Sequence, residues 1–310
     1  MASIKLADLL RQMNDPVALI KSDEEAYCKS IRDTALSVVT SGRIRVILLA
    51  GPSGSGKTTT ANLLSDEIKR LGERSMVVSL DDFYLDANDS RYPRFADGGR
   101  NFESPYALNT DVLHQTLADI VAGRDFTVPK YDFKVGGCVG MTKYKGFANG
   151  SVIIEGIHGL NPMFSDPFPK DKLMRLFVSV STNIEDEGGV ILSGRKLRFI
   201  RRMVRDSIYR AADARRTLGM WEKVLEGENE YLYPYKHLAD VRFDTFHRFE
   251  AAVMKPYAIE LLDAGVRSES AYADIVARAL ERIPVIDSAL VPDNSLIREF
   301  IHGGIYEHLY

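Results

Sequence analysis

Short, nearly continuous apolar runs alternate along this chain with longer segments whose apolar residues recur at helical spacing. The runs are rich in valine, isoleucine and leucine, which is typical of strands buried on both faces of a parallel sheet. We predict strands at residues 44–50, 75–80, 151–154, 175–181 and 240–244. Helices are predicted at residues 4–13, 23–40, 57–71, 110–122, 195–216, 217–226, 246–262 and 270–282. The alternation predicts an α/β fold with a doubly wound parallel sheet.

Three segments depart from this alternation. Residues 126–133 and 141–147 are joined by glycine-rich residues and predict a small β-hairpin outside the main sheet. Residues 86–108 are polar and long for a plain connection, which favours a substrate-binding loop. Residues 186–193 contain two adjacent glycines and are predicted to form a hinge.

The first predicted strand leads into GPSGSGKT, a full match to the P-loop pattern G-x-x-x-x-G-K-[ST]. Glycines let such a loop fold around an anion, and the helix that follows directs its positive end at the same place. Lys57 can reach the β- and γ-phosphates, and the Thr58 hydroxyl can hold Mg²⁺. We therefore predict a P-loop NTPase site for ATP and Mg²⁺, formed by Gly51, Ser53, Gly54, Ser55, Gly56, Lys57, Thr58 and Thr59.

Acidic residues follow the next two predicted strands. Asp81 follows residues 75–80, and Glu155 follows residues 151–154. The carboxyl ends of parallel strands meet in the crevice where such sheets bind ligands. We predict that Thr58, Asp81 and Glu155 hold Mg²⁺ and that Asp81 accepts the proton of an acceptor hydroxyl. Asp82 is also a candidate for a helix cap or turn.

Residues 195–216 carry nine basic side chains against two acids. Helical spacing places four arginines on one face, at positions 195, 198, 202 and 205. That face could be solvated, could bind nucleic acid, or could form a helical lid over a transferring phosphate. Because a P-loop is present, we favour the lid, with Arg202 and Arg205 as catalytic residues.

Composition excludes several other classes of protein. The net charge is −3, so no overall basic field would attract nucleic acid. No apolar run reaches the roughly 18 residues that a membrane helix needs. The first residues lack the pattern of a secretory signal, and two isolated cysteines form neither a disulfide framework nor a metal site. We expect a cytoplasmic enzyme with a small-molecule substrate and neither a nucleic-acid nor a membrane partner; a homo-oligomer is left open.

Five motifs occur here in the order in which they occur in uridine kinases: SLDDFY, NFESP, PKYDF, VIIEGIHGL and RRMVRD. The chain thus resembles the uridine kinase and phosphoribulokinase group, and within it the bacterial uridine-kinase-like nucleoside kinases. The resemblance runs from about residue 43 to residue 304 and includes the patterns MW..V..GE and NS.IREFI.GG. It implies a kinase that uses ATP to phosphorylate the 5′-hydroxyl of a ribonucleoside.

The resemblance also implies roles for individual residues. Asp81 matches the catalytic aspartate, Glu155 the metal-side acid, and Arg202, Arg205 and Arg210 the lid arginines. Tyr84 and Glu103 match positions near the ribose, and Tyr131 and Phe133 match aromatic residues beside the base. The typical histidine after YDF is missing at residues 134–138, and a lid arginine is replaced at about Ala212. Trp221 adds a predicted stacking surface, and the preferred base stays open.

Two alternatives remain at this stage. A kinase of the same fold could act on a sugar phosphate or a pantothenate-like acceptor, and a P-loop ATPase or switch would need no acceptor at all. A guanine-reading Asn-Lys-x-Asp motif is absent, which disfavours a GTP switch. We predict an N-terminal helical appendage over residues 1–42, a kinase domain over residues 43–282 and a tail packed on it over residues 283–310.

Overall fold

A five-stranded parallel sheet lies at the centre of the computed structural model, which describes residues 2–95, 98–147, 149–264 and 266–309. Its strand order is β10-β7-β2-β6-β3. The strands are β2 (Val46–Ala50), β3 (Ser75–Ser79), β6 (Ser151–Glu155), β7 (Leu173–Ser179) and β10 (Val241–Asp244). All five predicted strands are present, and the predicted α/β fold class is confirmed.

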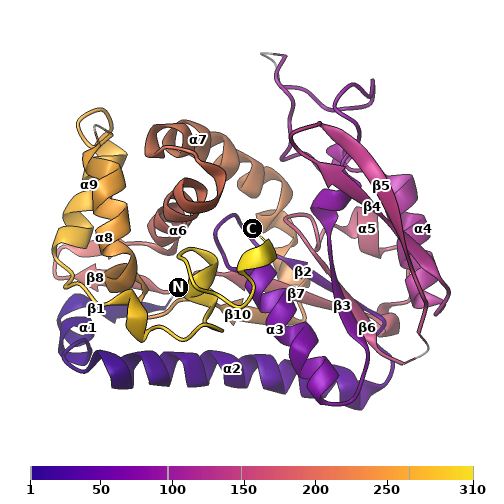
Figure 1. Ribbon diagram of the computed structural model, residues 1–310, viewed down its shortest axis with the longest axis horizontal. Coiled ribbons are helices and arrows are strands. Elements are labelled where there is room, and N and C mark those ends of the chain that lie inside the picture. The colour runs from indigo at the N-terminus through magenta and orange to yellow at the C-terminus, as the bar shows by residue number, and fades with distance from the viewer. Residues whose placement is uncertain (1, 96–97, 148, 265, 310) are drawn as a thin grey trace.

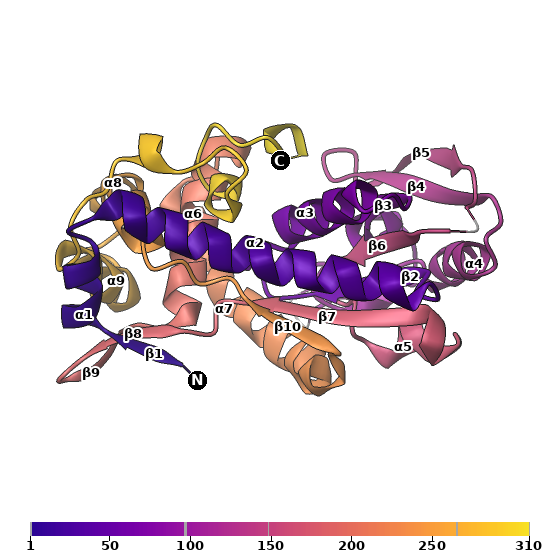
Figure 2. The same ribbon diagram turned by 90° about the horizontal axis from the view of Figure 1, so that it is seen from below.

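Alternate side chains of β2 enter two hydrophobic layers, one on each face of the sheet. Ile47 and Leu49 pack in the layer that includes α2 (Pro16–Ser41) and α3 (Lys57–Arg70). Val46 and Leu48 pack in the layer that includes α4 (Thr110–Val121), α5 (Pro162–Ser165) and the hairpin of β4 (Phe126–Asp132) and β5 (Gly137–Tyr144). In Figures 1 and 2, α2 runs beside α3, while α4 and the hairpin lie at one end of the molecule. Both faces of the sheet are therefore covered.

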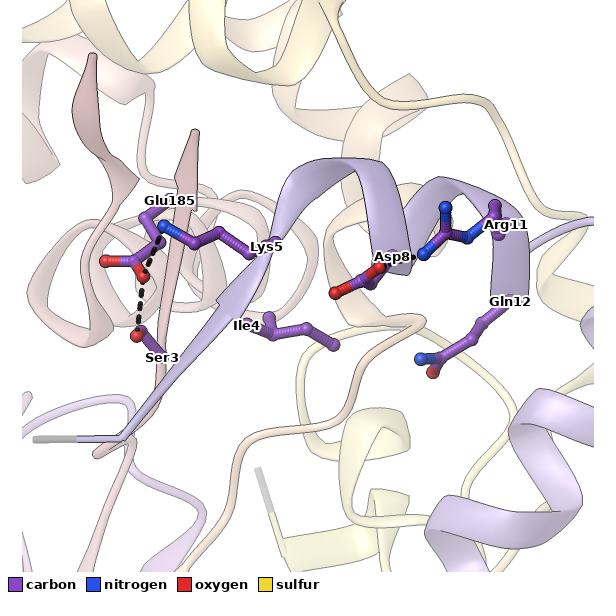
Figure 3. A pocket seen from close by; sticks show the side chains of 7 residues that line it. All are labelled: Ser3, Ile4, Lys5, Asp8, Arg11, Gln12 and Glu185. Carbon is purple, nitrogen blue, oxygen red and sulfur yellow. Dashed lines mark hydrogen bonds and ion pairs between the residues drawn. The ribbon is translucent and has the colours of Figure 1, made fainter. Parts of the chain in front are cut away.

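The N-terminal segment corrects two predictions. Residues 3–5 form a strand, β1 (Ser3–Lys5), so helix α1 (Leu6–Gln12) begins later than predicted. The predicted hinge at residues 186–193 instead contains the turn at residues 187–188, which joins β8 (Asn183–Asp186) to β9 (Gly189–Leu192), and β9 itself. These strands form a second sheet in which β1 is parallel to β8. Figure 3 shows Ser3 and Lys5 both reaching Glu185, which fixes this distant pairing.

The basic segment is two helices separated by a break. Helix α6 (Gly194–Arg210) ends at Ala211, whose φ of 48° lies in the left-handed region. Helix α7 (Ala214–Tyr231) then begins with Asp213 as its cap, whose side chain accepts a hydrogen bond from the Arg216 amide. The predicted helix over residues 195–216 therefore ends early, and α7 leaves in a new direction (Figure 1).

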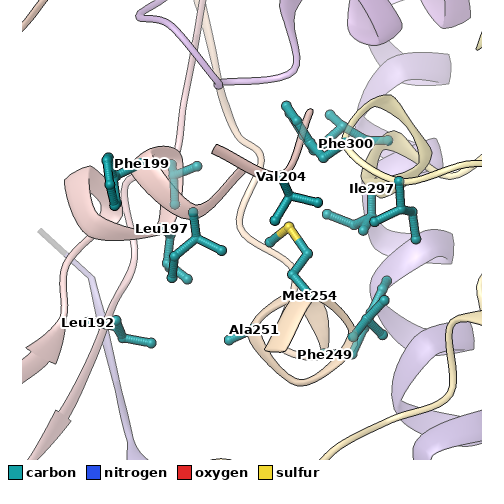
Figure 4. Packing of buried hydrophobic residues seen from close by; sticks show 14 of the residues in the cluster. Leu192, Leu197, Phe199, Val204, Phe249, Ala251, Met254, Ile297 and Phe300 are labelled. Atoms are coloured by element: carbon teal, nitrogen blue, oxygen red, sulfur yellow. The ribbon is translucent and has the colours of Figure 1, made fainter. Parts of the chain in front are cut away.

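The C-terminal part packs into the same hydrophobic core as helix α6. Helices α8 (Glu250–Asp263) and α9 (Ala271–Glu281) are followed by residues 283–309, which contain only short 3₁₀ turns among the residues described. Figure 4 shows Ile297 and Phe300 of this segment beside Val204 of α6 and Met254 of α8, and all four are fully buried. No helix in the described part of the chain is both long and apolar enough to cross a bilayer.

Candidate active site

The loop between β2 and α3 contains two glycines in conformations that other residues rarely adopt. Gly54 and Gly56 have φ angles of 72° and 86°. Their surroundings are also closed: an added Cβ would lie 2.7 Å from the Arg198 carbonyl oxygen at Gly54 and 2.6 Å from the Leu296 side chain at Gly56. The loop leads into the first turn of α3, whose backbone N–H groups have no partners within the helix. This is the arrangement that binds phosphate.

A cavity of about 220 Å³ opens beside this loop. The Ser55 hydroxyl is buried and, within the described residues, has no hydrogen-bond partner, which fits a site for a ligand oxygen. The Lys57 ammonium donates to the carbonyl oxygen of Pro52, 3.2 Å away, and lies in the cavity wall. The wall is formed by Ser53, Gly54, Ser55, Gly56, Lys57, Thr58, Asp81, Tyr84, Glu103, Glu155, Gly156, Ile157, Arg202, Arg205, Arg210 and Glu299. Residues from six separate parts of the sequence thus meet at the predicted phosphate cradle.

Two predicted cradle residues lie behind the wall. Gly51 supports the loop, because an added Cβ would lie 2.2 Å from the Val178 carbonyl oxygen. Thr59 donates its amide and its hydroxyl to one carboxylate oxygen of Glu299, at 3.2 and 2.9 Å. The other oxygen of Glu299 lies 3.6 Å from an Arg205 nitrogen. Sequence reasoning gave Glu299 no role, although it lies within the NS.IREFI.GG pattern.

Two predicted metal-side acids face the cavity from neighbouring strand ends. Burial raises the pKa of Glu155 to about 7; Lys57 opposes the shift and Asp81 adds to it. Asp81 is open to the cavity but enclosed by protein, and this desolvation raises its pKa against the opposing charges of Lys57 and Arg210. The Ser79 hydroxyl donates to Glu155 at 3.1 Å. These carboxylates are held at an energetic cost, which is typical of functional sites.

The donor set at this point fits Mg²⁺. Carboxylate and hydroxyl oxygens from Asp81, Glu155 and Thr58 are hard ligands, and Mg²⁺ usually combines one or two carboxylates with water and substrate phosphates. The described residues contain no group of three or more histidines, cysteines or acids that could hold a metal alone. A cation bound largely through nucleotide phosphates needs no such group.

The four arginines predicted on one face of α6 have different surroundings. Arg202 and Arg205 line the cavity, and Arg202 donates to the Ser53 hydroxyl at 2.8 Å. Arg198 is instead 2% exposed and paired with a glutamate of α7, while Arg195 is exposed to solvent.

Asp206 holds the cavity arginines together. Its carboxylate lies 3.3–3.4 Å from nitrogens of Arg202, Arg205 and Arg210. Arg210 lines the mouth of the cavity although more than half of its side chain is exposed. Four basic side chains of the wall face four acidic ones, so its formal charges balance, and the three arginines gathered by Asp206 supply local positive charge for a phosphate.

Tyr84 and Glu103, which were predicted to lie near a ribose, both line the cavity wall. The Tyr84 hydroxyl donates to the carbonyl oxygen of Phe102, 2.8 Å away, which holds the acceptor loop next to the turn after β3. Burial raises the pKa of Glu103 to about 7, with Arg202 opposing the shift and Glu228 adding to it. Glu103 and Lys57 thus line the same cavity.

An aromatic cluster extends from Tyr84 away from the cradle. The rings of Phe133 and Tyr131 both lie 5.6 Å from the Tyr84 ring, and that of Phe102 lies 6.0 Å away. Phe133 is 59% exposed, whereas Tyr131 is buried. Neither Tyr131 nor Phe133 is among the described residues that line the cavity itself. The cluster therefore extends from the cavity wall at Tyr84 and offers aromatic surface on which a planar ring could stack.

Trp221 lies apart from this cluster. It is buried between α7 and its neighbours, with its ring 5.5 Å from that of Phe199 and its indole N–H donating to the Tyr272 hydroxyl at 3.2 Å. Among the described cavity-lining residues it does not appear. We therefore do not retain Trp221 as a substrate contact, and its place is explained by core packing.

Comparison with known proteins gives this arrangement a family. The family model "Phosphoribulokinase / Uridine kinase family" matches residues 46–251, more than half of the chain. A uridine kinase from Schizosaccharomyces pombe is 31% identical over 189 residues, which cover 61% of this chain and 37% of that protein. A uridine kinase from Staphylococcus haemolyticus is 28% identical over 199 residues, covering 63% and 85%. The chain spans less than two fifths of the length of several of these relatives.

A comparison with solved structures matches one described as a possible uridine kinase from Bacillus stearothermophilus. It is 19% identical, covers 71% of this chain and 98% of its own, and has a TM-score of 0.49. The P-loop, the strand-end acids and the cavity arginines described above all fall within the residues that the family model matches. The chain belongs to the phosphoribulokinase/uridine kinase family.

Proposed function

We propose that this protein is an ATP- and Mg²⁺-dependent kinase that phosphorylates the 5′-hydroxyl of a ribonucleoside. One observation carries the proposal: the P-loop, Asp81 and Glu103 line a single cavity that the aromatic cluster extends. Family membership supports phosphoryl transfer, and relatives named uridine kinase support a nucleoside acceptor.

Each group in the cavity has a task in this reaction. The cradle and Lys57 bind the triphosphate, and Arg202 and Arg205 stabilise charge on the transferring phosphoryl group. Asp81 accepts the proton of the 5′-hydroxyl, and its raised pKa brings it closer to the pH at which a general base works best. Bound Mg²⁺ would neutralise phosphate charge beside Thr58 and Glu155.

Glu103 would select the sugar. Its carboxylate is largely removed from solvent and can accept hydrogen bonds from two vicinal hydroxyls, while Tyr84 and Phe133 offer surface to the base. A 2′-deoxyribonucleoside leaves part of that carboxylate without a partner, which costs about 1.5–3 kcal/mol for a hydrogen bond to a charged group. Ribonucleosides should therefore exceed their 2′-deoxy forms in kcat/KM by roughly ten-fold or more.

The experiment measures kcat/KM for uridine, cytidine, a purine ribonucleoside and their 2′-deoxy forms, with wild type and Glu103→Gln. We expect the glutamine to reduce the ribose preference mainly by slowing the ribose substrates. Glu226→Gln on the exposed side of α7 serves as a matched control that keeps the preference. Equal rates for ribose and deoxyribose would remove the assignment of Glu103, and phosphorylation of a sugar phosphate or pantothenate alone would replace the proposed acceptor.

A further inference from the structure

Helix α6 contains two arginines that the proposed reaction does not use. Arg198 and Arg201 are 2% and 0% exposed, and neither is among the described residues that line the cavity. Arg198 makes a two-pronged ion pair with Glu228 of α7, at 2.7 and 2.8 Å. Arg201 pairs with Glu250 of α8 at 2.6 Å. Buried ion pairs add little to stability compared with apolar residues of similar size, so their presence here calls for a function.

One further donor of each arginine reaches the phosphate loop. Arg198 donates to the carbonyl oxygen of Ser53 at 2.8 Å, and Arg201 donates to that of Gly54 at 3.3 Å. The Thr245 hydroxyl donates to the next carbonyl, that of Ser55, at 2.8 Å. Arg201 in turn binds the Thr245 backbone carbonyl at 2.6 Å. The carbonyl oxygens of Ser53, Gly54 and Ser55 therefore all accept hydrogen bonds from buried side chains.

Holding these carbonyls determines where the amides point. In a trans peptide the C=O of one residue and the N–H of the next point in opposite directions. Fixing the carbonyls of Ser53 and Ser55 toward the protein interior turns the N–H groups of Gly54 and Gly56 the other way. Both glycines line the cavity, so their amides are directed at the phosphate position.

Ser53 is held at every polar group it has. Its amide donates to Glu228 at 2.9 Å, its carbonyl accepts from Arg198, and its hydroxyl accepts from Arg202. The residue before Glu228 reaches the acceptor side as well, because an added Cβ on Gly227 would lie 2.4 Å from the Cβ of Glu103. Helix α6 thus contacts the phosphate loop, and α7 contacts both that loop and the loop that contains Glu103.

We propose that the buried pairs Arg198–Glu228 and Arg201–Glu250, with Thr245, are positioning groups for the phosphate donor. They hold the carbonyls of the P-loop toward the protein interior, away from the cavity, and thereby keep its amides aimed at ATP. The inference rests on the proposed function for its ligand, but it concerns donor binding alone and needs no acceptor.

The test separates positioning from stability by replacing a whole ion pair. Arg198→Met alone leaves Glu228 buried without its partner, and we expect a large loss of stability. The double variant Arg198→Met/Glu228→Leu should recover much of the wild-type melting temperature, because methionine can pack where Arg198 lies 5.5 Å from the Trp221 ring centre. The double variant loses the charged hydrogen bonds that Arg198 and Glu228 make to Ser53, and calorimetric ATP binding should therefore weaken by about ten-fold or more, since one such bond alone corresponds to roughly that factor.

Two further variants keep the test decisive. Thr245→Val is nearly isosteric and removes the hydroxyl that donates to the Ser55 carbonyl and accepts from Arg201, so ATP binding should weaken roughly three- to ten-fold in a folded protein. Arg248→Met/Asp23→Leu removes a partly buried pair between α2 and the turn before α8, and ATP binding should not change. Wild-type ATP affinity in folded Arg198→Met/Glu228→Leu or in Thr245→Val would overturn the inference. A wild type that binds ATP but phosphorylates no nucleoside would overturn the proposed function and leave this inference standing.

Discussion

Replacing Glu155 with glutamine should make the protein more stable and less active. The side chain is buried at the end of β6, and the Ser79 hydroxyl that donates to it can donate equally to a glutamine oxygen. Its pKa rises from an ordinary 4.5 to about 7 because burial disfavours the charged form. Ionising Glu155 near neutral pH therefore costs more free energy in the folded protein than in the unfolded chain, and this difference lowers the stability of the fold.

The size and pH dependence of this cost follow from the two pKa values. Below about pH 4.5 the carboxyl is protonated in both states, so it costs nothing. The cost grows between pH 4.5 and 7 and is constant above that range. At 1.36 kcal/mol per pKa unit, its upper limit is about 3 kcal/mol of unfolding free energy. Glutamine removes the ionisation, so its advantage should increase with pH over the same interval.

Urea unfolding of wild type and Glu155→Gln at pH 5, 6, 7 and 8, without nucleotide or Mg²⁺, measures this advantage directly. Other carboxyl groups with raised pKa values, such as Glu24 and Glu103, are present in both proteins, so their effects cancel in the difference between the two unfolding free energies. The exposed Glu226→Gln is the control and should show no such trend. A stability difference that stays constant from pH 5 to pH 8, or a glutamine variant that is less stable at pH 8, would refute the reasoning.

Four other substitutions test individual groups of the site. Asp81→Asn should lower kcat by about 10²–10⁴-fold with little change in the nucleoside KM, and a change in KM alone would make Asp81 a binding residue. Arg202→Ala and Arg205→Ala should each slow phosphoryl transfer; normal rates with a salt-sensitive loss of nucleic-acid binding would support a different role for α6. Glu299→Gln should lower the KM for ATP, because a neutral amide at the start of α3 repels phosphate less than a carboxylate does; a higher KM would show that the charge assists binding.

The parts of this structure that sequence could predict are those whose signals are local. The β2 strand, the P-loop and α3 are contiguous, and each has its own residue pattern. Asp81 and Glu155 were placed in the site because parallel strands must end at the same edge of the sheet. The hairpin and the position of α4 follow similarly from short-range periodicity and turn residues.

The parts that sequence could not predict depend on partners far along the chain. Helical spacing predicts the angular positions of the arginines on α6. It does not reveal their buried ion-pair partners, because Glu228 lies 30 residues from Arg198 and Glu250 lies 49 residues from Arg201. Glu299 reaches Thr59 across 240 residues. The left-handed Ala211 that ends α6 has no glycine or proline to signal it.

The account's central claim is phosphoryl transfer from ATP to a nucleoside in the cavity beside the P-loop. The most direct measurement incubates the protein with Mg²⁺, γ-labelled ATP and each common nucleoside, and maps the labelled position in the product. We expect label on the 5′-oxygen of at least one ribonucleoside, and none with Lys57→Ala, whose ammonium lies in the cavity wall. Release of labelled inorganic phosphate without any labelled nucleoside, or undiminished transfer by Lys57→Ala, would contradict the account.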